Sequence, residues 1–589
     1  MKERLASFQA VDRKPTAWIA DGQVQIRALG EIPACLRLAQ QALARGDLHA
    51  LQQQLESPQL MQVQTSWNRS PVRVDLALMV VRLLEQLERY GEALSWCRKI
   101  EGIEPSGLLY WQMAELLMHD TAQPDHMSQA RLMAERSVER DPENLAFIHR
   151  LAILECRTGL LEQGLEHLRI LLQRSPDTPL FLSNWLWYHL YSPTSTRALF
   201  AQGYRRLARL QPALPNPPEC QNDPDPDRPL RVGFISPDFR RCAAARSLEA
   251  VIDGLRQSSL KLYAYVHVRL PDDTTKRISS KFHQYRDVFG WPPSAIAERI
   301  RQDRVDILIE IGGFVKDHAL EVFRYRPAPI QMDYHGLATT GMSEMDYRVT
   351  DAYLDPPGGL GDYTERSIFL HGVHCFCPPQ ISPLIGPLPA LSNGYVTFGS
   401  LNNHFKITDS MIQLWARILL AVPNSRLIIK SLQGDDRGIK QLIKDKFMDW
   451  GVVPDRLEWI EPIPSHQAHL DLYNRIDLCL DTFPFNGCIT TFESLWMGVP
   501  VLTRVGETFV SRVGLSMLSH LDLAIFCSHN DQEYVDKAIS FANQLESLAA
   551  LRPSLRSRLL ASPLCDPRRM ARELEQAFRS MWRQWCAER

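Results

Sequence analysis

Apolar residues in the first 210 positions recur at the spacing of amphipathic helices, with almost no strand-like alternation of apolar and polar residues. Four prolines, Pro105, Pro142, Pro176 and Pro212, each close a helical stretch, and they stand 37, 34 and 36 residues apart. Proline lacks a backbone N–H and interrupts helices. These spacings therefore predict a repeated unit of paired helices.

The unit from Asn144 to Asp177 shows the repeat most clearly. Ala152 and Gly164 lie on either side of a Thr158-Gly159 turn and are small enough to let two helices approach closely. The pattern resembles tetratricopeptide repeats, and the alternative interpretation is a generic helical bundle. Stacked helix pairs form a concave surface suited to an extended peptide or another protein.

The pattern changes after the proline-rich stretch 212–229, which contains seven prolines and predicts a linker. Beyond it, short β-rich runs alternate with helical stretches, which is typical of α/β architecture. The predicted strands lie in the runs 230–236, 305–311, 395–398, 426–430, 476–480 and 500–503. A second proline-rich stretch, 378–389, divides this part into two units of similar size.

The predicted fold is an all-α helical repeat followed by two facing doubly wound, Rossmann-like domains, the GT-B arrangement. The predicted segments are an N-terminal helical region (1–70), tetratricopeptide-like repeats (71–212), a linker (213–229), an N-terminal Rossmann-like domain (230–377), a linker (378–393), a C-terminal nucleotide-sugar-binding domain (394–560) and a C-terminal helix (561–589). Neither G-x-G-x-x-G nor G-x-x-x-x-G-K-[ST] occurs, which argues against dinucleotide oxidoreductases and P-loop enzymes.

Composition narrows the class of protein without naming a chemistry. The 589 residues carry 66 basic and 68 acidic side chains, so the net charge of −2 gives no general reason to bind nucleic acid. The clearest apolar stretch near the N-terminus, 76–81, is too short to span a membrane, and no signal peptide is recognisable. The 12 cysteines are scattered, which favours a reduced, cytoplasmic setting, and no set of metal ligands is apparent.

The most specific segment runs from Asp481 to Pro500. A strand ends at Asp481, a loop carries Asn486-Gly487, and Thr490, Thr491 and Glu493 open a helix whose free N–H groups predict a phosphate site. Glu493 is placed to reach a ribose hydroxyl. The alternative is purely structural, with Thr490 as N-cap and Glu493 completing a capping box.

A second segment, 397–408, carries Lys406 in a loop between a strand and a helix that begins near Thr408. A lysine at this place can neutralise a diphosphate leaving group without a metal ion. An isolated loop lysine is usually only solvated, so this interpretation depends on its neighbours.

From about Pro229 to Trp585 the chain resembles the protein O-GlcNAc transferase family, including its SPINDLY-like and bacterial members. The stretches that carry the resemblance are 231–240, 326–331, 345–351, 396–400, 414–419, 422–427, 481–500, 511–514 and 562–566. Helical repeats ahead of the catalytic half are also the order of domains in that family.

The resemblance implies a donor-binding role for a defined set of residues. Lys406 lies where the family has its diphosphate-binding lysine, and Asn403 at a neighbouring donor-contacting position. His469 lies where a histidine packs near the uracil. Cys488, Ile489 and Thr490 are implied to hold the phosphates, and Glu493 the ribose. The predicted donor-binding set is Asn403, Lys406, His469, Gly487, Cys488, Ile489, Thr490, Thr491 and Glu493.

The acceptor side departs from the family. Cys242 stands where the family has a histidine once proposed as the catalytic base, and Phe314 stands where bacterial relatives have another. His335 is a candidate substitute base, although a lone histidine beside Tyr334 is more often a packing residue.

The resulting hypothesis is a metal-independent, inverting glycosyltransferase that moves a sugar, most simply GlcNAc, from a nucleotide sugar to Ser or Thr of a protein bound by the repeats. Lys406 and His335 are its candidate catalytic residues, UDP-GlcNAc or another nucleotide sugar is the donor, and no cofactor is expected. The alternatives are an asparagine-modifying N-glycosyltransferase, a protein O-fucosyltransferase, and a catalytically silent scaffold that binds a sugar nucleotide.

Overall fold

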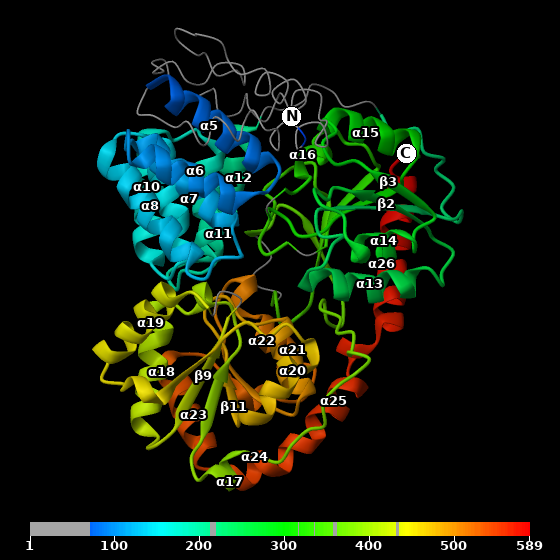
Figure 1. The fold of residues 1–589 in the computed structure, drawn as a ribbon. Helices are drawn as coiled ribbons and strands as arrows, with labels where there is room; N and C mark the ends of the chain where they lie inside the picture. The colour runs from blue at the N-terminus through cyan, green and yellow to red at the C-terminus, as the bar shows by residue number, and fades with distance from the viewer. Residues whose placement is uncertain are drawn as a thin grey trace. The chain divides into compact units, whose positions relative to one another are not determined.

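The computed structural model describes residue 53 and residues 71–211, 219–315, 317–334, 336–356, 362–431 and 435–589 (Figure 1). Apart from Gln53, the predicted N-terminal region 1–70 therefore lies outside the described residues, as does His335. The chain forms two compact units: Met1–His167 with Asp436–Ile439, and Leu168–Asp435 with Lys440–Arg589.

The first unit is helical where it is described, and successive helices pack on one another. Its helices are α5 (Pro71–Gln86), α6 (Tyr90–Glu101), α7 (Gly107–His119), α8 (His126–Arg140), α9 (Leu145–Arg157) and the beginning of α10 (Leu161–Arg174). A Cβ atom on Gly164 of α10 would lie 2.6 Å from the Ala152 carbonyl oxygen of α9. Glycine at this position lets the two helices meet, which confirms the close approach predicted from the sequence.

Two further helices, α11 (Pro179–His189) and α12 (Arg197–Leu210), begin the second unit. Thr196 caps α12, because its side chain accepts a hydrogen bond from the Leu199 N–H at 3.2 Å. Gly203 of α12 packs on Leu186 of α11 so closely that any larger residue would clash. The all-helical pattern thus continues to residue 210.

The first α/β domain contains a seven-stranded, all-parallel sheet in the order β3-β2-β1-β4-β5-β6-β7. The strands are β1 (Arg231–Ser236), β2 (Lys261–Val266), β3 (Gln284–Asp287), β4 (Ile307–Glu310), β5 (Ile330–Asp333), β6 (Tyr347–Thr350) and β7 (Arg366–Phe369). The helices between them are α13 (Ala243–Leu255), α14 (Asp273–Ser279), α15 (Pro293–Gln302) and α16 (Leu320–Phe323). β1 and β4 are almost entirely buried, which is why both appear as unbroken apolar runs.

The second α/β domain contains a six-stranded, all-parallel sheet in the order β10-β9-β8-β11-β12-β13. Its strands are β8 (Thr397–Ser400), β9 (Arg426–Lys430), β10 (Leu457–Ile460), β11 (Leu478–Leu480), β12 (Val501–Arg504) and β13 (Cys527–Ser528). Its α-helices are α17 (Ala390–Asn393), α18 (Asp409–Ala421), α19 (Arg437–Asp449), α20 (His466–Asp471), α21 (Ile489–Trp496), α22 (Val513–Ser519), α23 (Asp531–Ala542), α24 (Leu545–Leu551) and α25 (Leu555–Ala561). Short 3₁₀ turns include η2 (His404–Lys406) and η4 (Leu472–Arg475).

Each of the six strands predicted from the sequence is present, and the two sheets confirm the predicted doubly wound fold. In each sheet the strand order reverses between neighbouring parallel strands, β1 and β4 in one and β8 and β11 in the other. Loops that leave the carboxyl ends of two such strands diverge and open a crevice, where ligands bind in folds of this kind.

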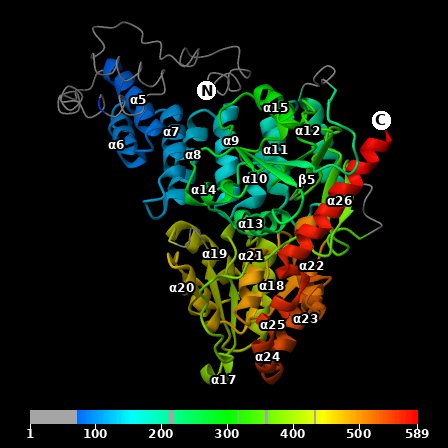
Figure 2. The same cartoon turned by 90° about the vertical axis from the view of Figure 1, so that its right-hand side faces the viewer.

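The last helix, α26 (Pro567–Ala587), follows the second α/β domain in sequence but packs on the first. A Cβ on Gly254 of α13 would lie 2.7 Å from the Ala571 Cβ of α26, and the Tyr334 hydroxyl lies 3.3 Å from the Met570 sulfur. Figures 1 and 2 show this helix, in red, beside α13.

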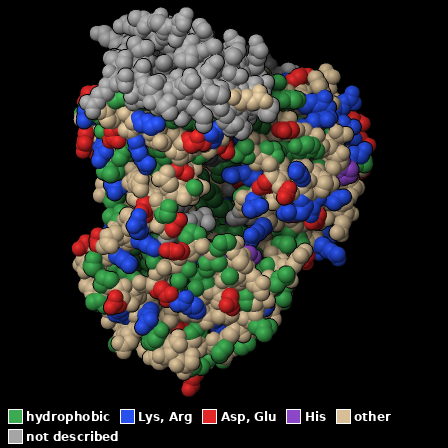
Figure 3. All heavy atoms as spheres, in the orientation of Figure 1, with side chains coloured by type: hydrophobic (Ala, Val, Ile, Leu, Met, Phe, Trp, Pro, Cys, Tyr) green, Lys and Arg blue, Asp and Glu red, His purple; other side chains and the backbone are tan. Residues whose placement is uncertain are grey.

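Charge is mixed over the surface of the α/β domains. On the face drawn in Figure 3, Lys and Arg side chains are interspersed with Asp and Glu. Among the described residues, no helix combines the length and apolar character needed to cross a bilayer.

Candidate functional site

Lys406 lies in η2, the single turn that follows β8. Its Nζ donates a hydrogen bond to the Asn486 carbonyl oxygen at 2.9 Å and lies 4.2 Å from the centre of the Phe485 ring. Burial lowers the pKa of Lys406 to about 8, although the charge of Asp481 opposes this effect. Thr408 then caps α18, as the sequence predicts. The lysine is thus fixed against the loop that follows β11.

The side chain of Asp481 holds the loop that follows β11 through hydrogen bonds. One carboxylate oxygen accepts hydrogen bonds from the N–H groups of Gly487, at 2.7 Å, and Thr482, at 2.9 Å. The other oxygen accepts the Thr503 hydroxyl at 2.8 Å. Burial raises the pKa of Asp481 to about 6, and these hydrogen bonds limit the rise. The loop is therefore folded around a buried carboxylate.

The helix that follows, α21, begins at Ile489, and its N-cap residue is Cys488, which makes no side-chain cap hydrogen bond. The capping-box interpretation of Thr490 and Glu493 is therefore wrong. Instead, the Thr490 hydroxyl donates to the Asn402 side chain at 3.1 Å. The first N–H groups of an α-helix have no partner within the helix, and α21 begins three residues after Asn486, whose carbonyl oxygen accepts the Lys406 hydrogen bond.

Position 487 requires glycine because the first turn of α21 lies very close to its Cα. A Cβ atom at this position would lie 2.5 Å from the Thr490 hydroxyl oxygen and 2.9 Å from that of Thr491. The Thr491 hydroxyl in turn donates to the Gly487 carbonyl oxygen at 3.1 Å. The loop and the first turn of α21 are thus closely packed, and the predicted residues 487–491 belong to this one structure.

Glu493 is held by two histidines of α20. One carboxylate oxygen accepts a hydrogen bond from His466 Nε2 at 2.9 Å and the other from His469 Nε2 at 3.0 Å. Burial alone would raise the pKa of Glu493, but the two histidines outweigh it and bring the pKa down to about 2. Glu493 is therefore an ionised hydrogen-bond acceptor, although it is buried and only 5% exposed.

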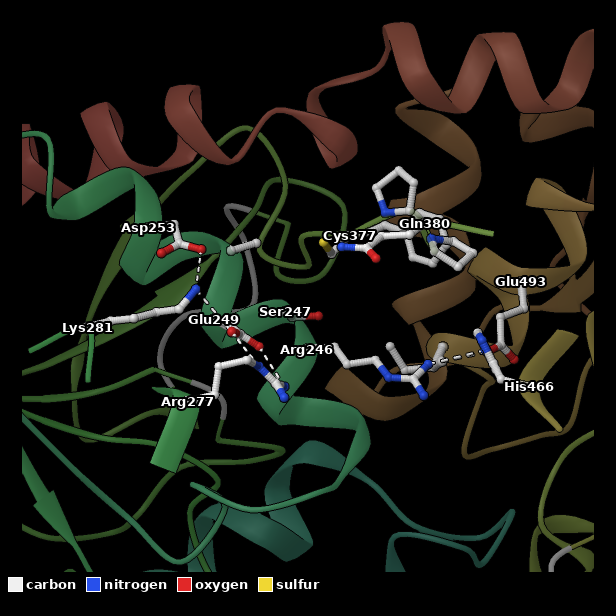
Figure 4. A pocket seen from close by; sticks show the side chains of 15 residues that line it. Arg246, Ser247, Glu249, Asp253, Arg277, Lys281, Cys377, Gln380, His466 and Glu493 are labelled. Atoms are coloured by element: carbon white, nitrogen blue, oxygen red, sulfur yellow. Dashed lines mark hydrogen bonds and ion pairs between the residues drawn. The ribbon is translucent and has the colours of Figure 1, made fainter. Parts of the chain in front are cut away.

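A cavity of about 560 Å³ lies beside Glu493, between the two α/β domains (Figure 4). On the second domain it is lined by Ile489, His466 and Glu493. From α13 of the first domain, Arg246 reaches across, with its guanidinium 3.3 Å from His466 Nε2 and 3.8 Å from Glu493. Both α/β domains therefore contribute side chains to this cavity.

The wall formed by the first domain is an ion-pair network. Glu249 accepts hydrogen bonds from Arg277 at 2.9 and 3.1 Å and forms an ion pair with Lys281 at 3.0 Å. Lys281 also pairs with Asp253. Figure 4 shows these side chains directed toward one another, with Arg246 pointing away from them toward His466. Arg246 is the cation of this wall that is directed at the second domain.

The remaining predicted residues fall in different places. Asn403 precedes η2, and its side chain accepts a hydrogen bond from the Ser431 hydroxyl at 3.3 Å, close to Lys406 in sequence. Cys242 is the N-cap residue of α13, and its thiol lies 3.5 Å from the Asp238 carbonyl oxygen. Phe314 stacks on Tyr204 of α12, with ring centres 4.7 Å apart. Phe314, at the position where the resemblance implies a histidine in bacterial relatives, thus makes a packing contact.

Sequence reasoning missed three residues of the site: Asn402, His466 and Arg246. Asn402 stands one position before the predicted Asn403, and His466 lies one helical turn before His469, so the spacing of three residues was an available signal. Arg246 had no local signal, because its role depends on the approach of another domain. Among the described residues, no group of three or more His, Cys, Asp and Glu side chains is arranged to hold a metal ion.

Comparison with known proteins gives a consistent result. The model of glycosyl transferase family 41 matches residues 216–377 and 388–574. The probable UDP-N-acetylglucosamine–peptide N-acetylglucosaminyltransferases SPINDLY of Solanum lycopersicum and Arabidopsis thaliana are each 37% identical over 65% of this chain. The matched region covers 41% and 42% of those two proteins, so the chain spans about two fifths of the length of these curated relatives.

A solved structure matches over a larger share of the chain. It is a variant of the Thermobaculum terrenum O-GlcNAc transferase, 30% identical, with a TM-score of 0.78. The match covers 94% of this chain and 98% of that one, helical repeats included.

Proposed function

Because the chain belongs to glycosyl transferase family 41, we propose that it transfers N-acetylglucosamine from UDP-N-acetylglucosamine to Ser or Thr of a protein acceptor. The names of the SPINDLY relatives include this donor and a peptide acceptor. The observation that carries the proposal is the meeting of Lys406 with the loop 481–488 at the start of α21, where Nζ lies 2.9 Å from the Asn486 carbonyl oxygen. That is where a diphosphate would be neutralised.

The proposed reaction is a single, inverting displacement. The acceptor hydroxyl attacks the anomeric carbon while the bond from that carbon to the diphosphate oxygen breaks, and the hydroxyl proton is lost to a base. Negative charge grows on the diphosphate, and Lys406 with the first N–H groups of α21 is arranged to stabilise it. Cationic stabilisation of this kind supports the further proposal that no metal ion is needed.

Glu493 has a separate role in this proposal. Its two oxygens are charged and already aligned by His466 and His469, so it can accept hydrogen bonds from the two ribose hydroxyls of the nucleotide. The adjacent cavity of about 560 Å³ is large enough for part of a nucleotide. The donor site thus combines a charge-neutralising end at Lys406 with an orienting end at Glu493.

A transfer assay tests this function. The full chain is incubated with a lysate and with labelled UDP-GlcNAc, UDP-glucose or GDP-fucose, and the labelled residue is identified by mass spectrometry. Transfer from UDP-GlcNAc to Ser or Thr is expected, and Lys406→Met should reduce it at least about a hundredfold. The exposed Lys276, in α14, provides the matched control Lys276→Met, which should transfer normally. Unchanged transfer by Lys406→Met would show that the donor site is assigned wrongly.

Three other outcomes would replace the proposal. Label on asparagine indicates an N-glycosyltransferase, and label from GDP-fucose a protein O-fucosyltransferase. The third is a silent scaffold, which Cys242 and the stacked Phe314 favour, because they stand where the family has acceptor-side histidines. Nucleotide binding by calorimetry, without transfer to any lysate protein, would establish that alternative.

We further propose that the helical repeats bind the protein acceptor, since stacked helix pairs present extended binding surfaces. A cytoplasmic site of action fits the cysteines of the described residues, which form no disulfide bonds with one another.

A further inference from the structure

Tyr191, just after α11, lies against both loops of the donor site. Its ring is stacked on that of Phe485, with centres 4.9 Å apart and planes 14° from parallel. The same ring meets Phe405 edge-on at 5.2 Å. Tyr191 is 4% exposed, so these are contacts of a buried side chain. The three rings form a cluster, Tyr191–Phe405–Phe485, that joins α11 to the second α/β domain.

Two residues of the cluster are sequence neighbours of the residues that form the Lys406 hydrogen bond. Phe405 immediately precedes Lys406, and Phe485 immediately precedes Asn486, whose carbonyl oxygen accepts the Lys406 hydrogen bond. The Lys406 ammonium also lies 4.2 Å from the centre of the Phe485 ring, within the range of a cation–π interaction. Displacing either phenylalanine would therefore move the lysine or its acceptor.

We propose that Tyr191 is a positioning residue for the donor lysine: it clamps Phe405 and Phe485 so that Lys406 points at the start of α21. The proposal rests on the proposed function only in that Lys406 neutralises the diphosphate. It makes the end of the helical repeat a part of the donor site. The geometry of a charged group decides its effect on a transition state, and a displacement of about 1 Å can cost about a hundredfold in rate.

The surroundings of Lys406 supply a readout that ordinary packing would not change. The groups that face its ammonium are the Asp481 carboxylate, the Cys488 thiol and the Asn486 carbonyl oxygen. Burial among these groups and the aromatic rings lowers the pKa of Lys406 to about 8. Removing the Tyr191 ring admits water, which raises that pKa toward its ordinary value of 10.5.

The test compares Tyr191→Ala with the conservative Tyr191→Phe. Phe181, a buried aromatic residue of α11, stands ten positions earlier in the chain, and Phe181→Ala is the matched control for lost packing. We expect Tyr191→Ala to lower kcat/KM for the donor about 10- to 100-fold at pH 7 and to move its alkaline limb to higher pH. Tyr191→Phe should retain most of the activity, and Phe181→Ala should keep the alkaline limb in place.

A second readout does not need turnover. In the full chain with ¹³C-labelled lysine, the Lys406 signal is assigned by its absence in Lys406→Met and titrated by NMR. The midpoint should rise in Tyr191→Ala and stay near 8 in Tyr191→Phe and Phe181→Ala. If the wild type transfers no sugar, the proposed function fails, while this titration still decides the positioning role. If Tyr191→Ala does not fold, Tyr191→Leu, which keeps more of the apolar volume but not the stacking, takes its place.

Two results would overturn the proposal. One is an unchanged Lys406 titration and unchanged kcat/KM in Tyr191→Ala. The other is an equal shift of both in Phe181→Ala, which would mean that any loss of packing in α11 has the same effect.

Discussion

Lys406→Met is expected to make the protein more stable while removing its activity. The pKa of Lys406 falls from 10.5 to about 8 on folding, and at about 1.4 kcal/mol per pH unit the folded state loses about 3 kcal/mol by holding this charge. Methionine has a similar length and no charge, and its sulfur can contact the Phe485 ring. The cost of leaving the Asn486 carbonyl without its hydrogen bond is about 1–2 kcal/mol. A net gain of roughly 1–2 kcal/mol at pH 7 remains.

The dependence on pH has a definite sign. Because the folded-state pKa of this lysine lies below its unfolded value, the penalty is complete below about pH 8 and disappears as the pH rises to 10.5. The stability advantage of Lys406→Met must therefore shrink between pH 8 and pH 10.5. Urea unfolding at pH 7, 8, 9 and 10, with the exposed-lysine variant Lys276→Met as control, measures it.

Two outcomes would refute this reasoning. A Lys406→Met protein less stable than the wild type at pH 7 would mean that the lysine is a net stabilising group. An advantage that stays constant from pH 7 to pH 10 would mean that it arises from packing rather than from the buried charge.

Three further predictions concern the other residues of the site. Glu493→Gln should lower the free energy of unfolding by about 2–3 kcal/mol at pH 7, because the pKa of Glu493 falls from 4.5 to about 2 on folding. That stability is present above pH 4.5 and is lost on acidification toward pH 2, so in urea unfolding the difference should shrink below pH 4.5; a difference that grows there contradicts the assignment. Thr490→Val removes the hydroxyl that donates to Asn402 and should weaken UDP binding about tenfold by calorimetry, and an unchanged Kd would exclude a role at the phosphates. Arg246→Ala should raise KM for the donor severalfold, most at low salt, with little change in kcat; equal loss in kcat would point to a role in chemistry.

The sequence was sufficient for the fold because its signals are local and repeated. Buried parallel strands such as 231–236 and 426–430 appear as apolar runs whatever surrounds them, and Gly164 marks a close helix contact within one repeat. The meeting of Lys406 with the start of α21 also follows from topology, since β8 and β11 are neighbours at the switch point of their sheet.

The contacts that could not be predicted from the sequence are those between segments distant in the chain. Thr490 and Glu493 fit a capping box by spacing, yet Thr490 turns to Asn402 and Glu493 to two histidines. Arg246 and Tyr191 reach the site from another domain and from the last pair of repeat helices, so no window of sequence around Lys406 contains them.

The return of α26 to the first α/β domain has a mechanical consequence. The chain passes from the first domain to the second through residues 377–389 and comes back through residues 561–566, so two separate connections join the domains. A single connection allows one domain to rotate in any direction relative to the other. Two separate connections restrict this rotation mainly to the axis that joins them. Rotation of one domain relative to the other should then follow one axis. A fragment that ends before Pro567 would lack α26, and would therefore lose both the second connection between the domains and the helix that packs on α13.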